Sequence, residues 1–466
     1  MSLSVPLDTR LAALVQGIEA GLFDGDDPDD GFMQDYHEFL FAYLASQTLA
    51  SQKPPRAVRR HVHREFKAAA DKLKAHYFSG DESLYLEDQF RRRFRMSPTL
   101  FYRLMNACIE EDPEFFRNKT VLTGKAGHDS FQKCTAALRI LAYGVPADSV
   151  DEYLQMSEGQ SRLAFYHFCR AIVSKFEGQY LSGPSPARLR RSLDINALRG
   201  FPGMVGSIDC MHWQWKNCPV AYQAQYKGKE GKPTVVLEAA AGPDLYFYHC
   251  FFGAPGTWND INVLNSSTFM QKLVEGVFSP AGESDFELNG LRFSIPYFLA
   301  DGIYPKWACF LKTKANGLKF SKWQEAIRKD VERAFGVLQN RFTILGRACQ
   351  LHSVEDMELV VKTCMIIHNM LVESGEVRFE EYQREADYVC PQPPVVGLDE
   401  GLHEDAEFHS LIAATCAVMS EPEHIRLQQA AVAHIDSLEQ QIPPSLEQVM
   451  SFLPRTPDVE DMDLNA

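Results

Sequence analysis

Three acidic residues have the types and settings that metal-dependent phosphodiester chemistry requires. Asp209 comes at the end of one short apolar run, Asp301 directly follows another, and Glu332 lies in a helical stretch. Cutting or transferring a phosphodiester requires stabilisation of both the attacking and the leaving oxygen. Two divalent ions roughly 3.5–4 Å apart provide it when carboxylates from different elements hold them. The sequence therefore predicts that these side chains converge and bind two catalytic ions, Mg²⁺ or Mn²⁺.

Short apolar runs separated by turn residues predict the strands that must position the two aspartates. The expected strands span 204–210, 234–240, 245–252 and 295–300. Gly242-Pro243-Asp244 joins the second run to the third and predicts an antiparallel hairpin. A helix that begins near Asp260 precedes the fourth strand. Strands in a row, a helix, a strand and a long helix predict a mixed α/β sheet of the ribonuclease-H-like type. If its first and last strands are neighbours, Asp209 and Asp301 meet at one edge.

A long helix over 321–342 is expected to position Glu332. Its apolar residues recur at steps of four, four, three and four, and they are Ile327, Val331, Phe335, Leu338 and Phe342. Glu332 follows Val331, so it falls on the border of this buried stripe and faces the sheet margin. Arg328, one turn earlier, is placed to pair with Glu332 or with a DNA phosphate.

Each acid also has a purely structural interpretation. Asp301 before Gly302 suits a turn, and Glu332 suits a surface salt bridge with Arg328. Asp260 lies in the first turn of its helix, where the helix dipole alone favours an acid. Asp209 is the hardest to explain structurally, because a carboxylate in an apolar strand is costly unless something pairs with it.

Residues 35–181 have a helical pattern without strand-like alternation. The helices expected at 131–143, 149–154 and 157–176 have the order of a helix-turn-helix unit. The start of its recognition helix supplies three candidate DNA contacts, Gln160, Ser161 and Arg162. An ordinary packed helical domain is an equally good interpretation.

Charge is divided unevenly along the chain. Of the net charge of −15, residues 1–53 carry −7 and residues 373–466 carry −16, which leaves +8 for the segment between. A basic body between acidic ends is typical of a DNA-handling core with solvated tails. The expected fold class is α+β. Its four segments are an acidic mobile N-terminus (1–34), the helical domain (35–181), the catalytic α/β domain (200–373) and an acidic C-terminal tail with some helix (374–466).

The composition favours a soluble intracellular protein. No run approaches the roughly 18 to 20 apolar residues that cross a bilayer. The 11 cysteines lack the regular spacing of a disulfide scaffold, so reduced thiols are expected.

Linked motifs follow one another between about 200 and 373. They are Gly206-Ser207-Ile208-Asp209-Cys210-Met211-His212-Trp213, Trp215-Lys216-Asn217-Cys218-Pro219, Pro233-Thr234-Val235-Val236-Leu237-Glu238-Ala239, Phe251-Phe252-Gly253, Asn259-Asp260-Ile261-Asn262-Val263-Leu264, Ala300-Asp301-Gly302-Ile303-Tyr304-Pro305, Val331-Glu332-Arg333-Ala334-Phe335-Gly336, Asn340-Arg341-Phe342 and Ile367-His368-Asn369-Met370. Together they resemble the catalytic domain of PIF/Harbinger transposases, particularly the plant-type branch, over more than a third of the chain.

This resemblance implies a DDE nuclease that acts on DNA with divalent metal. By position, the family's first acid falls on Asp209 and its helix glutamate on Glu332. The acid of the Asn-Asp motif falls on Asp260, and that of the Asp-Gly-Tyr-Pro-like motif on Asp301. Ile303 is the one visible departure and leaves the acid in place. Both middle acids are candidates for the second member of the triad. We favour Asp301 because it ends a strand, with Asp260 supporting or sharing a metal.

The expected reactions are cleavage at transposon ends and joining to target DNA. Four lysines between Asp301 and Glu332 suit phosphate binding or a solvated loop equally well, and they are Lys312, Lys314, Lys319 and Lys322. The resemblance also implies a homo-oligomer on DNA, a Myb-like DNA-binding partner protein, and location in the nucleus with a cytoplasmic pool. The alternative is a domesticated, catalytically silent chromatin or protein-interaction module.

Overall fold

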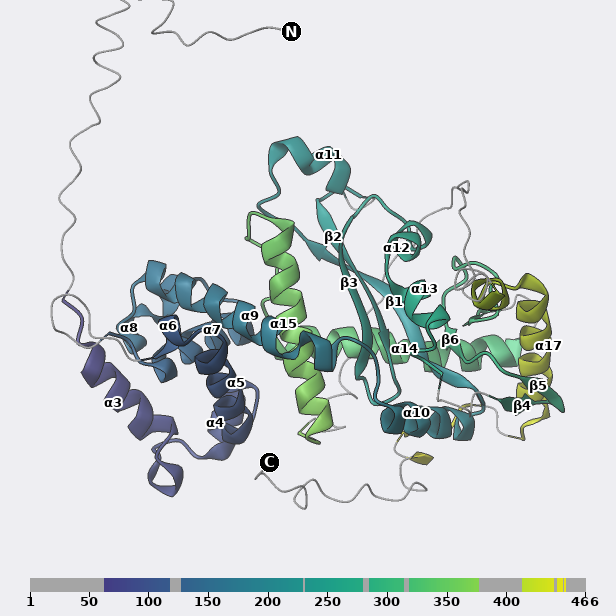
Figure 1. The fold of residues 1–466 in the computed structure, drawn as a ribbon, viewed down its shortest axis with the longest axis horizontal. Coiled ribbons are helices and arrows are strands. Elements are labelled where there is room, and N and C mark those ends of the chain that lie inside the picture. Colours follow the sequence, from purple (N-terminus) through teal and green to yellow (C-terminus); the bar gives the residue numbers. More distant parts are fainter. Residues whose placement is uncertain are drawn as a thin grey trace, which may run out of the picture. The chain divides into compact units, whose positions relative to one another are not determined.

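The computed structural model describes residues 63–117, 127–228, 231–279, 285–313, 318–376 and 413–439, with short pieces between 442 and 449. The chain from Arg64 onward forms one compact unit (Figure 1). The predicted acidic segment 1–34 lies outside the described residues. None of the described helices is long and apolar enough to cross a membrane.

In the described residues that precede the sheet the regular elements are all helices, as the sequence predicts for this region. They are α3 (Phe66–Tyr77), η1 (Gly80–Glu82), α4 (Glu87–Phe94), α5 (Pro98–Glu111), α6 (Pro113–Phe116), α7 (Ser130–Tyr143), η2 (Ala147–Val150), α8 (Asp151–Leu154), α9 (Glu158–Tyr180) and α10 (Pro186–Leu198). Side-chain caps begin several of them: Asp129 accepts from the backbone of Gln132, and Ser157 accepts from that of Gln160. The helices predicted at 131–143, 149–154 and 157–176 correspond to α7, to η2 with α8, and to α9.

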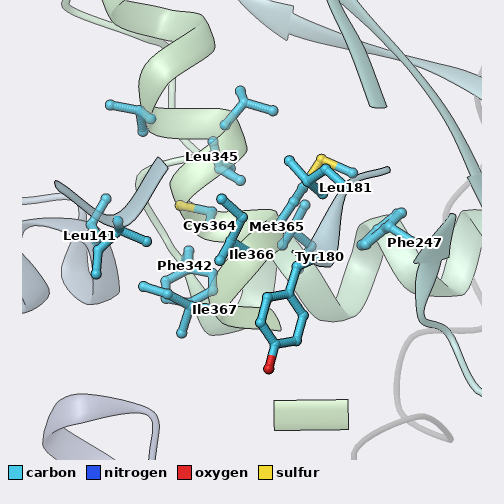
Figure 2. Close-up of a cluster of buried hydrophobic side chains, with 14 of the residues drawn as sticks. Leu141, Tyr180, Leu181, Phe247, Phe342, Leu345, Cys364, Met365, Ile366 and Ile367 are labelled. Atoms are coloured by element: carbon cyan, nitrogen blue, oxygen red, sulfur yellow. The ribbon is translucent and has the colours of Figure 1, made fainter. Parts of the chain in front are cut away.

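A continuous apolar core joins these helices to the sheet. Helix α9 packs against α7 and against α15 (Val354–Glu373). Figure 2 shows the labelled side chains of this junction, which are Leu141, Tyr180, Leu181, Phe247, Phe342, Leu345, Cys364, Met365, Ile366 and Ile367. Asn369 of α15 links both sides, because its Nδ2 donates to the carbonyls of Tyr180 and Phe247 at 2.9 Å each.

Five strands form a mixed sheet in the order β3-β2-β1-β6-β7. They are β1 (Met204–Gln214), β2 (Thr234–Ala241), β3 (Phe247–Pro255), β6 (Tyr297–Leu299) and β7 (Phe310–Leu311). Strands β1, β2 and β3 are antiparallel, so the predicted hairpin is confirmed, whereas β1-β6 and β6-β7 are parallel. Two further strands, β4 (Phe286–Leu288) and β5 (Leu291–Phe293), form a separate hairpin, and a short helix α11 (Gln223–Tyr226) lies between β1 and β2.

Strand β1 is longer than the sequence predicts. It continues four residues past Cys210 to Gln214, so Asp209 lies inside the strand rather than at its end. Met211 and Trp213 alternate with more exposed residues and are buried on the same face as Asp209. The continuous apolar run in the sequence ends before Asp209, but the alternation of buried and exposed residues after it is typical of a strand and continues to Gln214.

Helices cover the two faces of the sheet differently. Helix α14 (Leu318–Arg341) lies on the face of β1 that carries Asp209 and Met211, and its Gln339 contacts Met211. Its predicted apolar stripe is buried throughout. Helices α12 (Asp260–Ser266) and α13 (Phe269–Val274) lie on the opposite face, where Val263 packs beside Val236 and Cys210.

Part of the predicted acidic tail is a structural component of the unit. Helix α17 (Glu421–Ser437) packs against α14, β4 and β7. Its buried residues Leu427 and Ile435 join an apolar cluster with Trp323 and Ile327 of α14. His424 of this helix also contacts the Phe310 carbonyl of β7, at 2.9 Å from Nδ1. The apolar face of α17 therefore helps to hold the helix that carries Glu332.

Ile435→Ala should lower the free energy of unfolding by about 2–5 kcal/mol, because a fully buried side chain is truncated. Ile425→Ala is the matched control, since Ile425 lies on the same helix and is 44% exposed. Its effect should stay within about 0.5 kcal/mol. Urea denaturation followed by circular dichroism measures both. Equal, small effects would mean that α17 does not pack on the unit in solution.

Candidate active site

The register between β1 and β6 brings Asp209 beside Asp301. Ser207 pairs with Leu299 across these parallel strands. Two residues further along each chain are Asp209 and Asp301, so they occupy adjacent positions at the same level of the sheet. Sequence reasoning depended on the first and last predicted strands being neighbours, and they are.

Arg328 of α14 connects Asp209 to Glu332. Its Nη1 donates to Asp209 Oδ2 at 2.7 Å, and its Nη2 lies 2.8 Å from Glu332 Oε1. The second oxygen of Asp209, Oδ1, accepts from the backbone N–H of Cys210 at 2.9 Å. The three side chains are 17–28% exposed. Packing of the apolar stripe of α14 against the sheet therefore places Glu332 near Asp209, and Arg328 lies between the two acids.

Asp260 approaches from the other side of β1. It begins α12, where Asn259 supplies the cap by accepting from Asn262, so Asp260 is not the capping residue. It interacts with the thiol of Cys210, whose side chain points away from Asp209 because alternate residues of a strand face opposite ways. Asp301 influences both Asp209 and Asp260 electrostatically, so it lies within range of both acids.

Burial and mutual repulsion shift the titration of two of these acids. The pKa of Asp209 is raised to about 6, chiefly by burial; the charge of Arg328 opposes this shift, and the charges of Glu332 and Asp301 add to it. Burial also raises the pKa of Asp260 to about 7, and the neighbouring charge of Asp209 adds to the shift. Both carboxylates are therefore poorly compensated in the protein alone, and an additional positive charge would stabilise their ionised forms.

The donors of this cluster fit a hard divalent cation, which prefers carboxylate oxygens. Asp301 Oδ1 accepts from the backbone N–H of Gly302, whereas its Oδ2 is buried and has no hydrogen-bond partner among the described residues. A buried, unpartnered carboxylate oxygen beside two further acids is a natural cation ligand. Within the part of the chain that the structure describes, no group of three or more His, Cys, Asp or Glu side chains is arranged to hold a metal ion. The Arg328 guanidinium separates Asp209 from Glu332.

Residues 178–378 match the family model described as plant transposon protein. This span contains all four acids of the candidate site. Residues 70–108 match a domain of unknown function. Comparison with curated proteins gave no match, and comparison with solved structures gave none. The match supports a plant transposon-derived protein.

A fifth carboxylate, Glu238 of β2, was not among the predicted site residues. Glu238 is fully buried, and it lies opposite Cys210 in the antiparallel register of β1 and β2. Its Oε2 lies 3.1 Å from Nε2 of the equally buried His249, and its Oε1 has no hydrogen-bond partner. Its charge raises the pKa of Asp260 and of Cys210. The sequence could have pointed to Glu238, because burying a carboxylate inside the apolar run 234–240 costs as much as burying that of Asp209 in its strand.

The structure gives the predicted phosphate-binding lysines different roles. Lys312 donates to the carbonyl of Tyr304, and Lys319 donates to that of Leu438, so both amines are used internally. Lys322 is exposed on α14. Lys314 lies outside the described residues. Among the described lysines of this group, Lys322 is therefore the one that is exposed to solvent.

The three candidate DNA contacts at the start of α9 also differ. Gln160 is half-buried, and Arg162 is exposed and pairs with Glu158 one turn earlier. Ser161 is completely buried, and its hydroxyl is enclosed by protein. A side chain without exposed surface is not available to DNA, which removes Ser161 from this set.

The raised pKa values predict how stability depends on pH. An acid whose pKa is higher in the folded protein than its ordinary value of 3.8 binds its proton more tightly when folded. In EDTA, stability should therefore fall as pH rises through the interval from about 4 to about 7. Asp260→Asn should melt at the same temperature as wild type near pH 4 and at a higher one near pH 8.

Asp194→Asn is the control, because Asp194 is exposed on α10. It should shift the melting curve little at any pH. Thermal unfolding in EDTA across this pH range measures the effect. A wild-type protein that gains stability relative to Asp260→Asn as pH rises would contradict the assigned pKa shift.

Proposed function

We propose that this chain is a PIF/Harbinger-type DDE transposase or endonuclease that cuts DNA at transposon ends by two-metal-ion chemistry. One observation carries the proposal. Asp209 of β1 and Glu332 of α14 both contact Arg328, although 123 positions separate the two acids. Asp301 follows β6, the parallel neighbour of β1, and lies within electrostatic range of Asp209. The match of residues 178–378 to plant transposon proteins supports it.

The topology supports a ribonuclease-H-like assignment for the catalytic part. Three antiparallel strands are followed by two strands parallel to the first, in the order β3-β2-β1-β6-β7. A long helix then returns to the first strand with an acidic residue. In such a domain Asp301 is our choice for the second member of the triad, because it occupies the position beside Asp209.

Asp209, Asp301 and Glu332 are the proposed metal ligands, with Asp260 in a supporting role. The bound divalent ions would activate a water and stabilise the departing oxygen. The chain itself brings these carboxylates within electrostatic range of one another, and Asp260 is buried on the α12 side beside Cys210. Water attack on phosphorus breaks the bond to the 3′ oxygen, and the freed 3′-OH can attack target DNA.

DNA contacts outside the cluster are proposed from exposed basic and polar side chains. Lys322 lies on the catalytic helix, and Gln160 and Arg162 lie at the start of the proposed recognition helix α9. Neutralised phosphates make such binding salt-dependent. A Myb-like DNA-binding partner, assembly as a homo-oligomer on DNA and a nuclear location belong to the same proposal.

The purified protein, with and without the partner, should nick plasmid DNA that carries the terminal repeats of its element when Mg²⁺ or Mn²⁺ is present. Asp209→Asn, Asp301→Asn and Glu332→Gln should each slow cleavage by about 100-fold or more, as expected when a group that stabilises transition-state charge is lost. Asp260→Asn should lose less. Gel assays of nicked product give the rates.

Glu325→Gln is the matched control, because Glu325 is exposed on the same helix as Glu332. Its rate should equal that of wild type. If folded wild-type protein binds DNA or its partner but never cuts, the catalytic proposal fails. A domesticated chromatin or protein-interaction module would then be the better description.

A further inference from the structure

Arg328 occupies the place among the carboxylates where a cation is expected. Its two terminal nitrogens contact one oxygen of Asp209 and one of Glu332, at 2.7 and 2.8 Å. Both contacts are charge-assisted and use separate nitrogens of one planar group. The Arg328 side chain is only 17% exposed, so water screens these contacts weakly.

The guanidinium keeps its charge in this setting. An arginine guanidinium stays protonated in proteins, and here it lies against the carboxylates of Asp209 and Glu332. A permanent positive charge therefore lies among three proposed metal ligands. It offsets their repulsion, which would otherwise be costly in a half-buried cluster.

The arginine and a divalent cation would use the same oxygens. Asp209 Oδ2 and Glu332 Oε1 are taken by Arg328, and Asp209 Oδ1 is taken by the backbone N–H of Cys210. A cation that coordinates Asp209 Oδ2 and Glu332 Oε1 would compete with the guanidinium for these two oxygens. Two positive groups cannot share these oxygens without strong repulsion.

We propose that Arg328 is a positioning residue that holds Asp209 and Glu332 together in the metal-free protein and releases them when a divalent cation binds. The inference rests on the proposed function. Arg328 competes with the cation for the same carboxylate oxygens. It thereby keeps the acids in place before the ion arrives and lowers the affinity of the site for that ion.

The same helix supplies a matched comparison. Arg333, five residues later, pairs with Asp330, which also pairs with the buried Arg199 at 2.6 Å. Arg333 contacts none of the four proposed ligands in the ion pairs of the described residues. Arg333→Gln removes the same charge from α14 as Arg328→Gln does, but it leaves the bridge between Asp209 and Glu332 intact.

The test is Mn²⁺ binding to the full-length protein without DNA, measured by electron paramagnetic resonance of free Mn²⁺. The Asp209→Asn variant, in each background, defines the part of the binding that belongs to this site. Arg328→Gln should bind Mn²⁺ about tenfold more tightly than wild type, the effect expected when a competing charge-assisted contact is lost. Arg328→Lys should tighten binding by a smaller factor, because a point charge cannot bridge both acids.

Arg333→Gln should leave the Asp209-dependent affinity unchanged. In EDTA, Arg328→Gln should melt below wild type, because two carboxylates lose their partner, and Mn²⁺ should recover the difference. Far-UV circular dichroism checks that each variant is folded, and Arg328→Lys provides the answer should Arg328→Gln fail to fold.

Three results would overturn the inference alone: Arg328→Gln binds Mn²⁺ as wild type does, binds it more weakly, or gains no more than Arg333→Gln gains. In each case the site binds metal, so the proposed function stands. A protein in which neither wild type nor any Arg328 variant shows Asp209-dependent Mn²⁺ binding would overturn both, because no metal site would exist there.

Discussion

The negative charge of Asp209 inside the central strand is the constraint on which the site depends. A carboxylate between buried residues of β1 requires a positive partner. Arg328 supplies it from α14 and at the same time contacts Glu332. The position of α14 over β1 therefore depends on the ion pair between Arg328 and the carboxylate of Asp209. Metal binding, if it occurs as proposed, replaces one form of charge compensation by another.

Packing on both sides keeps α14 in the position that this pairing needs. From Val331 onward its stripe packs in the core shared with α9 and α15, whereas Trp323 and Ile327 lie in the apolar cluster with α17. The buried ion pair of Arg199 and Asp330 adds a directional constraint, because a rotation of α14 would separate the Asp330 carboxylate from the buried Arg199 guanidinium. The end of the chain thus contributes to the site without supplying a catalytic residue.

The acids divide between the two faces of β1. Asp209 and Glu332 lie on the α14 side, and Asp260 lies on the α12 side with Cys210 and the buried Glu238. Asp301 interacts with acids of both groups because it follows a neighbouring strand at the sheet edge. This arrangement is the physical reason for proposing Asp301 as the central metal ligand and Asp260 as a supporting residue.

The sequence by itself determined the local elements: the antiparallel hairpin, the buried stripe of α14, and Glu332 at its border, because side-chain periodicity is a local property. Motif resemblance identified the acids, but periodicity alone left Asp301 as either a turn residue or a ligand. Only the tertiary structure decided that β6 lies beside β1 and that Arg328 reaches Asp209. It also decided that Ser161 is buried and that the Lys319 amine donates to the Leu438 carbonyl. Register and pairing depend on packing between residues far apart in the chain, which no local pattern encodes.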